Sequence, residues 1–262
     1  MTDTVTDLDT AHAAMNAAPD DDAARLRFYE RLADTELFLL LAGEPEGDQI
    51  TPELFDIEDQ QFVLVFDREE RLSEFVGRTV PYAGLPGRGL AQMLAGQGIG
   101  LALNLQVAPS AMLIPGEGVD WLVDTLAHGP EQGEARIMEF TPPTGLPEAV
   151  VTGLDRKLAI AAGLAKLAYL AGAEHENGMK GHVLAFVDAV DGAEQSLANA
   201  ASEALTFSGI EAGAMDVLFL KASDPAAALL AKVGLRFDLP VPEKPQAPGA
   251  PGMDPDKPPK LR

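Results

Sequence analysis

The sequence contains no cysteine among its 262 residues. Disulfides, thiolate nucleophiles and cysteine-based structural zinc sites are therefore excluded together. The amino-terminal sequence MTDTVTDLDTAHAAMN lacks the basic start and apolar core of a secretory signal. No uncharged apolar run reaches the ~18 residues of a transmembrane helix, because Lys166 interrupts the nearest candidate. These absences predict a soluble cytoplasmic protein.

Basic residues are scarce, with 19 Lys and Arg against 41 Asp and Glu, which gives a formal net charge of -22. The summed field of such a chain repels phosphate backbones and anionic lipid surfaces. No local basic patch stands out against this total. We therefore expect neither nucleic acid nor a membrane as a partner, and instead expect a protein or a small molecule.

The hydrophobic content of 47% is sufficient for the cores of two ordinary domains. We predict an α+β protein with two small α/β-sandwich-like domains. The predicted organisation is an acidic segment at 1–19, a first domain at 20–130, a second domain at 131–239 and a proline-rich tail at 240–262. The tail holds eight prolines, which predicts a disordered or polyproline-like segment, with docking through its PxxP spacings as the alternative.

The first domain is organised around residues 90–127. This stretch predicts a short helix, a buried strand at Ile99–Leu103, a turn at Pro109–Ser110, a strand at Met112–Ile114 and a closing helix. Upstream, the pattern predicts a helix to about Asp34, buried strands at 37–42 and 62–66, and a helix through Leu72 and Phe75. Asp67 and Glu70 match a capping box, and turn-forming residues crowd positions 81–89.

The second domain has the predicted order strand, helix, strand, strand, helix, strand, which is the ferredoxin-like βαββαβ arrangement. Its strands are predicted at 136–140, 164–173, 182–188 and 217–220, and its helices from about Pro147 and from Asp191 to Leu205. The Asn177–Gly178 pair predicts a hairpin turn. A short helix at 225–233 and a terminal segment at 235–239 are expected to pack at the edge of the sheet.

One group of side chains has the chemistry of a metal site. It contains His175, His182, Asp188 and Asp191, whose imidazoles and carboxylates suit a divalent ion or an acid and base pair. The competing interpretation, which the sequence favours, gives His175 to a solvated loop and the two aspartates to a strand end and a helix cap.

Two glycine patterns superficially resemble phosphate loops. Gly96-x-Gly98-x-Gly100 follows a predicted helix and opens a strand, the reverse of a phosphate loop. The segment GLPGRG at 84–89 precedes a helix and offers Arg88, but it lacks the lysine and hydroxyl residue of a P-loop. A tight turn is the favoured interpretation, and an anion site is the alternative.

Ser110 is the remaining candidate nucleophile, with Asp124 and His128 nearby in the sequence. Nothing around it resembles a nucleophile elbow or an oxyanion hole, so a turn serine is favoured. Trp121 with Phe28 and Tyr29 fits either an aromatic pocket or the packing of the closing helix. No catalytic, cofactor-binding or metal residue is assigned, and no cofactor is predicted.

The order of three segments resembles the SseB-type N-terminal domain. These are FLLLA, then QFVLVFD followed by REERLSEFVG, then GIGLALNLQVAPSAMLIPGEGVDWL, which contains the sequence Gly-Leu-Ala-Leu-Asn at 100–104. The second half is similar to the SseB C-terminal domain in its helix at Pro147 and its strands at 166–171 and 216–220. The resemblance spans roughly residues 23–239 and implies no catalytic residue and no cofactor.

The leading hypothesis is a non-enzymatic two-domain protein that binds a protein or small-molecule partner. The alternative is a metal-assisted hydrolase that uses His175, His182, Asp188 and Asp191. Family naming also links SseB-type proteins to serine sensitivity and to a type III secretion translocon component. A secretion-associated or effector role is therefore a third hypothesis, although the sequence lacks the long coiled-coil or membrane-inserting segments of a translocon.

Overall fold

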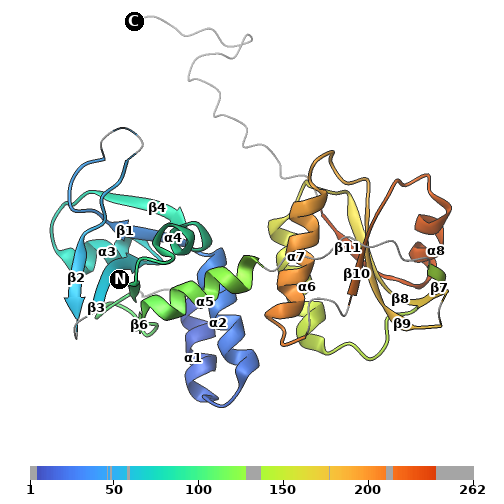
Figure 1. Cartoon of the computed structure of the whole chain (residues 1–262), viewed down its shortest axis with the longest axis horizontal. Helices are drawn as coiled ribbons and strands as arrows, with labels where there is room; N and C mark the ends of the chain where they lie inside the picture. The colour runs from blue at the N-terminus through green and yellow to red at the C-terminus, as the bar shows by residue number, and fades with distance from the viewer. Residues whose placement is uncertain are drawn as a thin grey trace, which may run out of the picture.

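A computed structural model of the chain describes residues 5–45, 47, 49–57, 60–127, 137–176, 178–210 and 215–239. These residues form two lobes that lie side by side (Figure 1). We refer to residues 5–127 as the N-terminal lobe and to residues 137–239 as the C-terminal lobe. Each lobe combines its own sheet with helices, which confirms the predicted α+β class. The predicted tail at 240–262 and the predicted boundary near Gly129 lie outside the described residues.

The sheet of the N-terminal lobe has the strand order β4-β1-β3-β5-β6, with β2 also paired to β3. Among the described strand pairs of this sheet, only β3 and β5 are parallel. The strands are β1 (Glu36–Leu40), β2 (Leu54–Ile57), β3 (Gln60–Phe66), β4 (Tyr82–Pro86), β5 (Ile99–Leu103) and β6 (Met112–Ile114). The segment at 81–89, expected to be turns, instead supplies edge strand β4 and the start of a helix, because its residues find hydrogen-bonding partners along β1.

Alternating residues of β3 supply two different cores. Val63 and Val65 join the main core, which α1 (Asp7–Ala17), α2 (Asp22–Asp34), α4 (Gly87–Leu94) and α5 (Gly116–Ala127) cover. Phe62, Leu64 and Phe66 point to the opposite face, where α3 (Glu69–Val76) packs. The apolar run of β3 therefore reflects a strand that is buried on both faces.

Helix α1 falls in the segment for which we expected only acidic sequence. Thr6 caps it in a reciprocal capping box with Asp9, and Leu8 is buried in the core of the N-terminal lobe. The capping box predicted at Asp67 and Glu70 is wrong. Arg68 is the N-cap of α3 and makes no side-chain cap, because Asp67 is engaged with Arg71 and Thr6 instead.

The C-terminal lobe follows the predicted element order but not the ferredoxin-like topology. Its sheet runs β10-β9-β8, and β7 and β11 share the far edge of β8. In the ferredoxin-like fold, a helix connects two parallel strands, and another strand lies between them in the sheet. Here β9 and β10 pair directly in parallel, because α7 returns the chain to the neighbouring position. The ferredoxin-like prediction is therefore wrong in its strand order.

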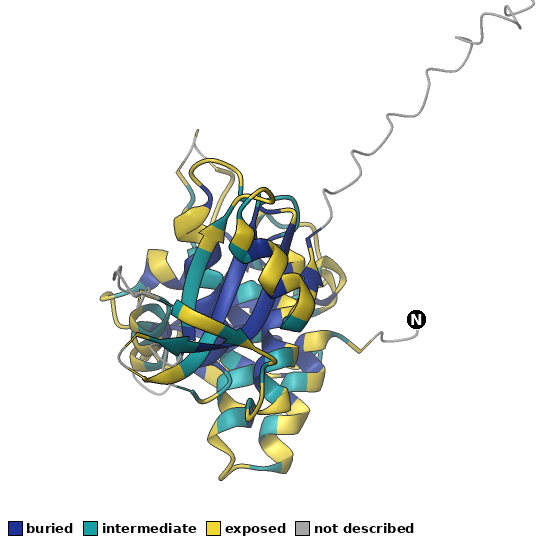
Figure 2. Ribbon diagram, turned by 90° about the vertical axis from the view of Figure 1, so that its right-hand side faces the viewer, coloured by how far each residue is buried: buried dark blue, intermediate teal, exposed yellow. Residues whose placement is uncertain are grey.

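The sheet of this lobe lies between two helical layers. Helices α6 and α7 cover one face, and α8 covers the other. Figure 2 shows the buried strands behind helices whose outer sides are exposed. The elements are β7 (Ile137–Thr141), α6 (Glu148–Ile160), β8 (Leu167–His175), β9 (Lys180–Val187), α7 (Glu194–Thr206), β10 (Met215–Leu220), α8 (Pro225–Val233) and β11 (Leu235–Asp238). Among the described helices, none is long and apolar enough to cross a membrane.

Candidate functional site between the two lobes

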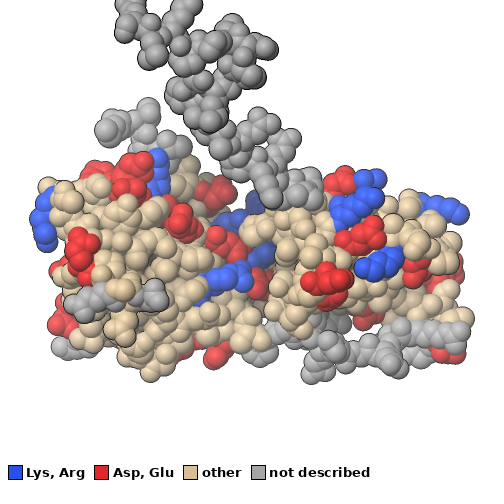
Figure 3. Space-filling model, turned by 90° about the horizontal axis from the view of Figure 1, so that it is seen from above, with Lys and Arg blue, Asp and Glu red and all other residues tan. Residues whose placement is uncertain are grey.

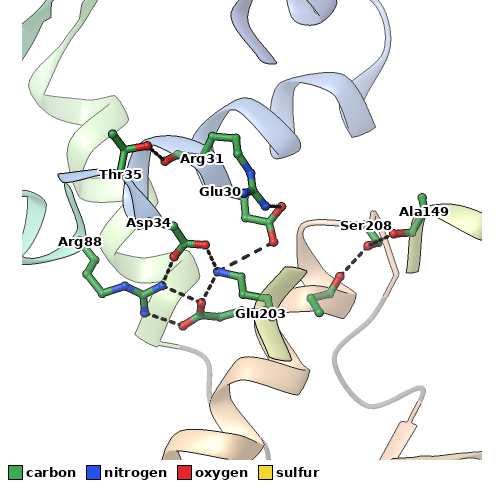
Figure 4. A network of polar contacts seen from close by, with 10 residues as sticks. Glu30, Arg31, Asp34, Thr35, Arg88, Ala149, Glu203 and Ser208 are labelled. Carbon is green, nitrogen blue, oxygen red and sulfur yellow. Dashed lines mark hydrogen bonds and ion pairs between the residues drawn. The ribbon is translucent and has the colours of Figure 1, made fainter. Parts of the chain in front are cut away.

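Helices from both lobes meet at the junction between them. The C-terminal half of α2 and the first turn of α4 face α6 and α7 of the C-terminal lobe (Figures 1 and 4). Figure 3 shows acidic and basic side chains next to one another where the lobes meet. We call the set Glu30, Asp34, Arg88, Lys157 and Glu203 the junction network.

Lys157 lies at the centre of the junction network and is only 3% exposed. Its Nζ is 2.7 Å from Asp34 Oδ2 in the other lobe and 2.8 Å from Glu203 Oε2 in its own lobe. The same ammonium lies 5.7 Å from the centroid of the Phe207 ring, which itself enters the core of the N-terminal lobe. A buried ammonium needs such partners, because its desolvation is costly.

Arg88 joins the same carboxylates from the side of α4. Its two terminal nitrogens donate to both carboxylate oxygens of Glu203 at 3.0 Å each, and one of them also donates to Asp34. This fork-to-carboxylate geometry is the strong form of an ion pair. The tight turn predicted at GLPGRG is wrong, because residues 84–86 belong to β4 and residues 87–89 begin α4. The segment presents Arg88 to the protein's own carboxylates, which occupy its donors in place of the alternative anion.

The pKa values of two carboxylates of the junction network shift in opposite directions. Burial raises the pKa of Glu30, and the nearby charges of Lys157 and Arg31 offset only part of this effect. Burial also acts to raise the pKa of Glu203, but hydrogen bonds and charges from Arg88 and Lys157 outweigh it and lower the pKa. The difference follows from hydrogen bonding, because Glu30 Oε1 accepts none and lies 3.8 Å from Lys157 Nζ.

Two clefts flank the junction network, and residues of both lobes line each one. The first has a volume of about 310 Å³ and is lined by Arg27, Glu30, Glu148, Ala149, Thr152, Gly153, Arg156, Phe207 and Ser208. The second has a volume of about 390 Å³ and is lined by Ala33, Asp34, Pro86, Arg88, Lys157, Ile160, Ala161, Leu164, Ser196, Asn199, Ala200 and Glu203. Clefts where two structural units meet are common places for ligands.

A second buried network, within the N-terminal lobe, contains the candidate nucleophile Ser110. The serine is fully buried, donates its proton to Asp9 Oδ1 and accepts a hydrogen bond from Asn104 at 2.9 Å. Arg71 binds Asp9 through both terminal nitrogens, at 3.1 and 2.6 Å, and also binds Asp67. Ser110 is therefore a structural hydroxyl, and of its predicted partners Asp124 lies on α5 and His128 lies outside the described residues.

The charge of Asp9 is strongly favoured in this network. Burial alone would raise the pKa of Asp9, but hydrogen bonds from Arg71, Ser110 and the Thr6 backbone hold that pKa well below its usual range. The network thus fixes α1 and α3 to the segment that follows β5.

The predicted metal group is divided between the two ends of a strand. His182 lies near the start of β9, beside the hairpin end that holds His175, whereas Asp188 and Asp191 follow the other end. Five residues of strand separate His182 from Asp188, which corresponds to roughly 20 Å. His175 pairs with Asp216 at 3.2 Å, and Asp188 accepts from the Ala222 backbone. Across the described residues, no group of three or more His, Cys, Asp or Glu could hold a metal ion.

The remaining candidates have packing roles. Gly96 and Gly98 adopt positive φ angles in the turn before β5, and the Gly96 amide donates to Asp120. Trp121 contacts the Tyr29 ring edge-on at 5.0 Å between centroids, and Tyr29 contacts Phe28 in the same manner. These rings join α5 to α2, as the packing interpretation predicts.

Of the junction network, the sequence pointed only to Arg88, and it did not indicate the ion pairs. A signal for Lys157 was available, because it falls on the apolar face of α6 defined by Val150, Leu154 and Leu158, where a lysine requires a partner. No comparable pattern marks Glu203, whose partners are Arg88 of the other lobe and Lys157 of α6.

These observations define a two-lobed α+β protein whose lobes are joined through buried ion pairs. The family model described as the SseB protein N-terminal domain matches residues 9–121. This part of the chain is therefore similar to the SseB N-terminal domain, as the resemblance in its sequence predicts. The match ends before the C-terminal lobe, so the SseB C-terminal domain stays a prediction. No curated protein and no solved structure matches the chain.

Proposed function

We propose that this protein is a non-enzymatic binding protein that presents both lobes to a protein or small-molecule partner at their junction. The observation that carries the proposal is the junction network, which fixes residues of both lobes around two clefts. A partner that occupies either cleft touches two lobes in one preset arrangement. Preset surfaces bind without the cost of ordering them first.

The side chains that could act as catalytic groups also support the proposal, because they bind other side chains of the protein. Ser110 and Asp9 bind each other and Arg71, and Lys157 binds Asp34 and Glu203. A nucleophile or a general base must instead reach a substrate. The alternative hydrolase has less support, because its four residues lie at opposite ends of β9.

The test is capture of partners from the native cytoplasm by the tagged protein, followed by mass spectrometry of proteins and of co-purified metabolites. Ile160→Arg places a charge at the rim of the larger cleft, where Ile160 is 64% exposed, and is expected to abolish capture of a partner that occupies this cleft. Leu229→Arg is the matched control, because Leu229 is also an exposed aliphatic residue of this lobe but lies on α8. A variant without residues 240–262 reports whether the tail contributes.

Turnover of a substrate panel by the purified protein would overturn the proposal. The panel is assayed with and without added divalent ions, because the alternative hydrolase requires one. Equal loss of capture in Ile160→Arg and Leu229→Arg would show that the partner does not bind at the junction.

A further inference from the structure

The smaller cleft brings two arginines together from different lobes. Arg27 comes from α2 of the N-terminal lobe, and Arg156 comes from α6 of the C-terminal lobe. Figure 4 shows Glu30 of α2 on one side of the junction, with Ala149 and Ser208 on the other. Two cations converge here in a chain that holds only 19 basic residues against 41 acidic ones.

Neither guanidinium uses all of its N–H donors on the residues that the structure describes. Arg156 is exposed and makes no hydrogen bond or ion pair within that part of the chain. Arg27 makes one ion pair, with Asp21 at 3.5 Å, in which both side chains are well exposed. This contrasts with Arg88, which forms three hydrogen bonds to two carboxylates a short distance away.

The acidic residues of the same cleft do not neutralise this pair of arginines. Glu30 turns its oxygens to Arg31 and to Lys157, at 3.4 and 3.8 Å. Glu148 is exposed in the first turn of α6, and the described ion pairs include none between it and either arginine. The convergence therefore leaves guanidinium donors available to a ligand.

We propose that the cleft between Arg27 and Arg156 binds a small molecule through its carboxylate or phosphate group, which bridges the two lobes. The planar guanidinium fork matches the oxygens of both groups. The Thr152 hydroxyl, which has no partner among the described residues, adds a donor on the α6 side. Ser208 gives its proton to a backbone carbonyl, of Ala204 at 2.6 Å or Ala149 at 3.2 Å, so its oxygen is left to accept a hydrogen bond from a donor elsewhere on the ligand.

The size of the cleft and the charge of the protein restrict the ligand further. A volume of about 310 Å³ lies at the lower end of small-molecule pockets. The net charge of -22 opposes extended polyanions, whereas physiological salt screens distant charges beyond about 8 Å. A small anion therefore senses mainly the charges that line the cleft, which are the two arginines, Glu30 and Glu148. This inference rests on the proposed binding function and names the chemical class of its ligand.

The test is calorimetric titration of the full chain with inorganic phosphate and, separately, with malonate as a dicarboxylate probe. We expect saturable binding of at least one probe, weakened by about tenfold or more in Arg156→Gln and in Arg27→Gln, because each variant removes charged hydrogen bonds to the probe. Arg25→Gln is the matched control on α2, because Arg25 pairs with Asp22 and lies outside the cleft. Its affinity is expected to equal that of the unmodified protein.

Absence of saturable binding of both probes to the unmodified protein would overturn the anion site. Equal weakening by Arg25→Gln would overturn it too, because binding would then follow net charge alone. The stronger probe identifies the oxyanion as a phosphate or a carboxylate. Partner capture without binding of either probe leaves the proposed function standing and removes this site, whereas probe binding with substrate turnover keeps the site and removes the non-enzymatic function.

Discussion

At the scale of single residues, the segment that identifies the N-terminal domain has structural reasons for its sequence. A side chain at Gly100 would meet Ile114 O at 2.4 Å, so only glycine fits there. Asn104 adopts a φ of 48°, which asparagine tolerates better than most residues. Its side chain accepts from the Asp67 amide and donates to Ser110, both of which adjoin the buried pair of Asp9 and Arg71. The recognisable residues of this domain therefore hold its core together.

Arg71→Met is expected to destabilise the protein by about 3–5 kcal/mol, because it leaves the Asp9 and Asp67 carboxylates buried without their cation. Arg25→Met, which removes an exposed ion pair with Asp22, is the matched control and is expected to cost less than about 1 kcal/mol. Urea unfolding of both variants measures the difference. Similar midpoints would show that the buried network contributes little stability.

His12 provides a prediction about pH. Its ring is buried 5.7 Å from Phe28, and burial lowers its pKa while the nearby charge of Asp9 offsets part of the effect. The unfolded chain therefore takes up a proton more readily than the folded chain, so protonation favours unfolding as the pH falls below about 6.5.

His12→Gln removes this titration. We expect the unfolding free energy of the unmodified protein, relative to that of the variant, to decrease between about pH 7.5 and pH 5.5. Denaturant titrations across this range provide the measurement. A relative stability that is constant, or that increases on acidification, contradicts a neutral buried imidazole.

At the scale of elements, the start of α4 is fixed by a close approach to the end of α2. A side chain on Gly87 would lie 1.9 Å from Leu32 O, whereas one on Gly89 would meet nothing closer than Pro86 Cδ at 4.0 Å. Gly87→Ala is expected to destabilise the protein by about 1–3 kcal/mol. Gly89→Ala is expected to stabilise it by about 0.5–1 kcal/mol, since alanine is the better helix former. Thermal unfolding of the two variants should shift in opposite directions, and shifts of the same sign would refute the assignment.

The elements that were predicted from sequence are those whose signal is local. The apolar run at 62–66 and the closing helix after Met112–Ile114 depend on hydrophobic periodicity, and both were found. Strand β4 and the order of β9 and β10 depend on which strands pair, and periodicity does not encode pairing. Helix α1 has a weak apolar face and was missed, because its stability comes from Leu8 and Asp9 inside the lobe.

The same distinction applies to the candidate site. The sequence presents Arg88 and Ser110 as turn residues that could bind an anion or act as a nucleophile. In the structure, Arg88 pairs with Glu203, 115 residues away, and Ser110 pairs with Asp9, 101 residues away. Contacts at such separations form only when the lobe or the junction is assembled. The sequence therefore indicates these residues as candidates, but it does not predict that other side chains of the protein use their hydrogen-bonding groups.

At the scale of the whole molecule, the junction network makes the two lobes depend on one another. Glu30, Asp34 and Glu203 carry three negative charges, and Arg31, Arg88 and Lys157 balance them. Lys157 contacts carboxylates of both lobes, so its removal leaves Arg88 as the remaining ion-pair bridge from Glu203 to Asp34. The stability of each lobe is then less coupled to that of the other.

Lys157→Met tests this coupling, and Trp121 is a convenient reporter because it is the only tryptophan and lies in the N-terminal lobe. In the unmodified protein, fluorescence and far-ultraviolet circular dichroism should show coincident unfolding, as expected for a cooperative unit. In Lys157→Met, the loss of a buried cation is expected to cost about 3–5 kcal/mol and to separate the two transitions. Lys232→Met on exposed α8 is the control and should retain coincidence. Coincident, unshifted transitions in Lys157→Met would mean that apolar contacts such as Phe207 join the lobes without help from the ion pairs.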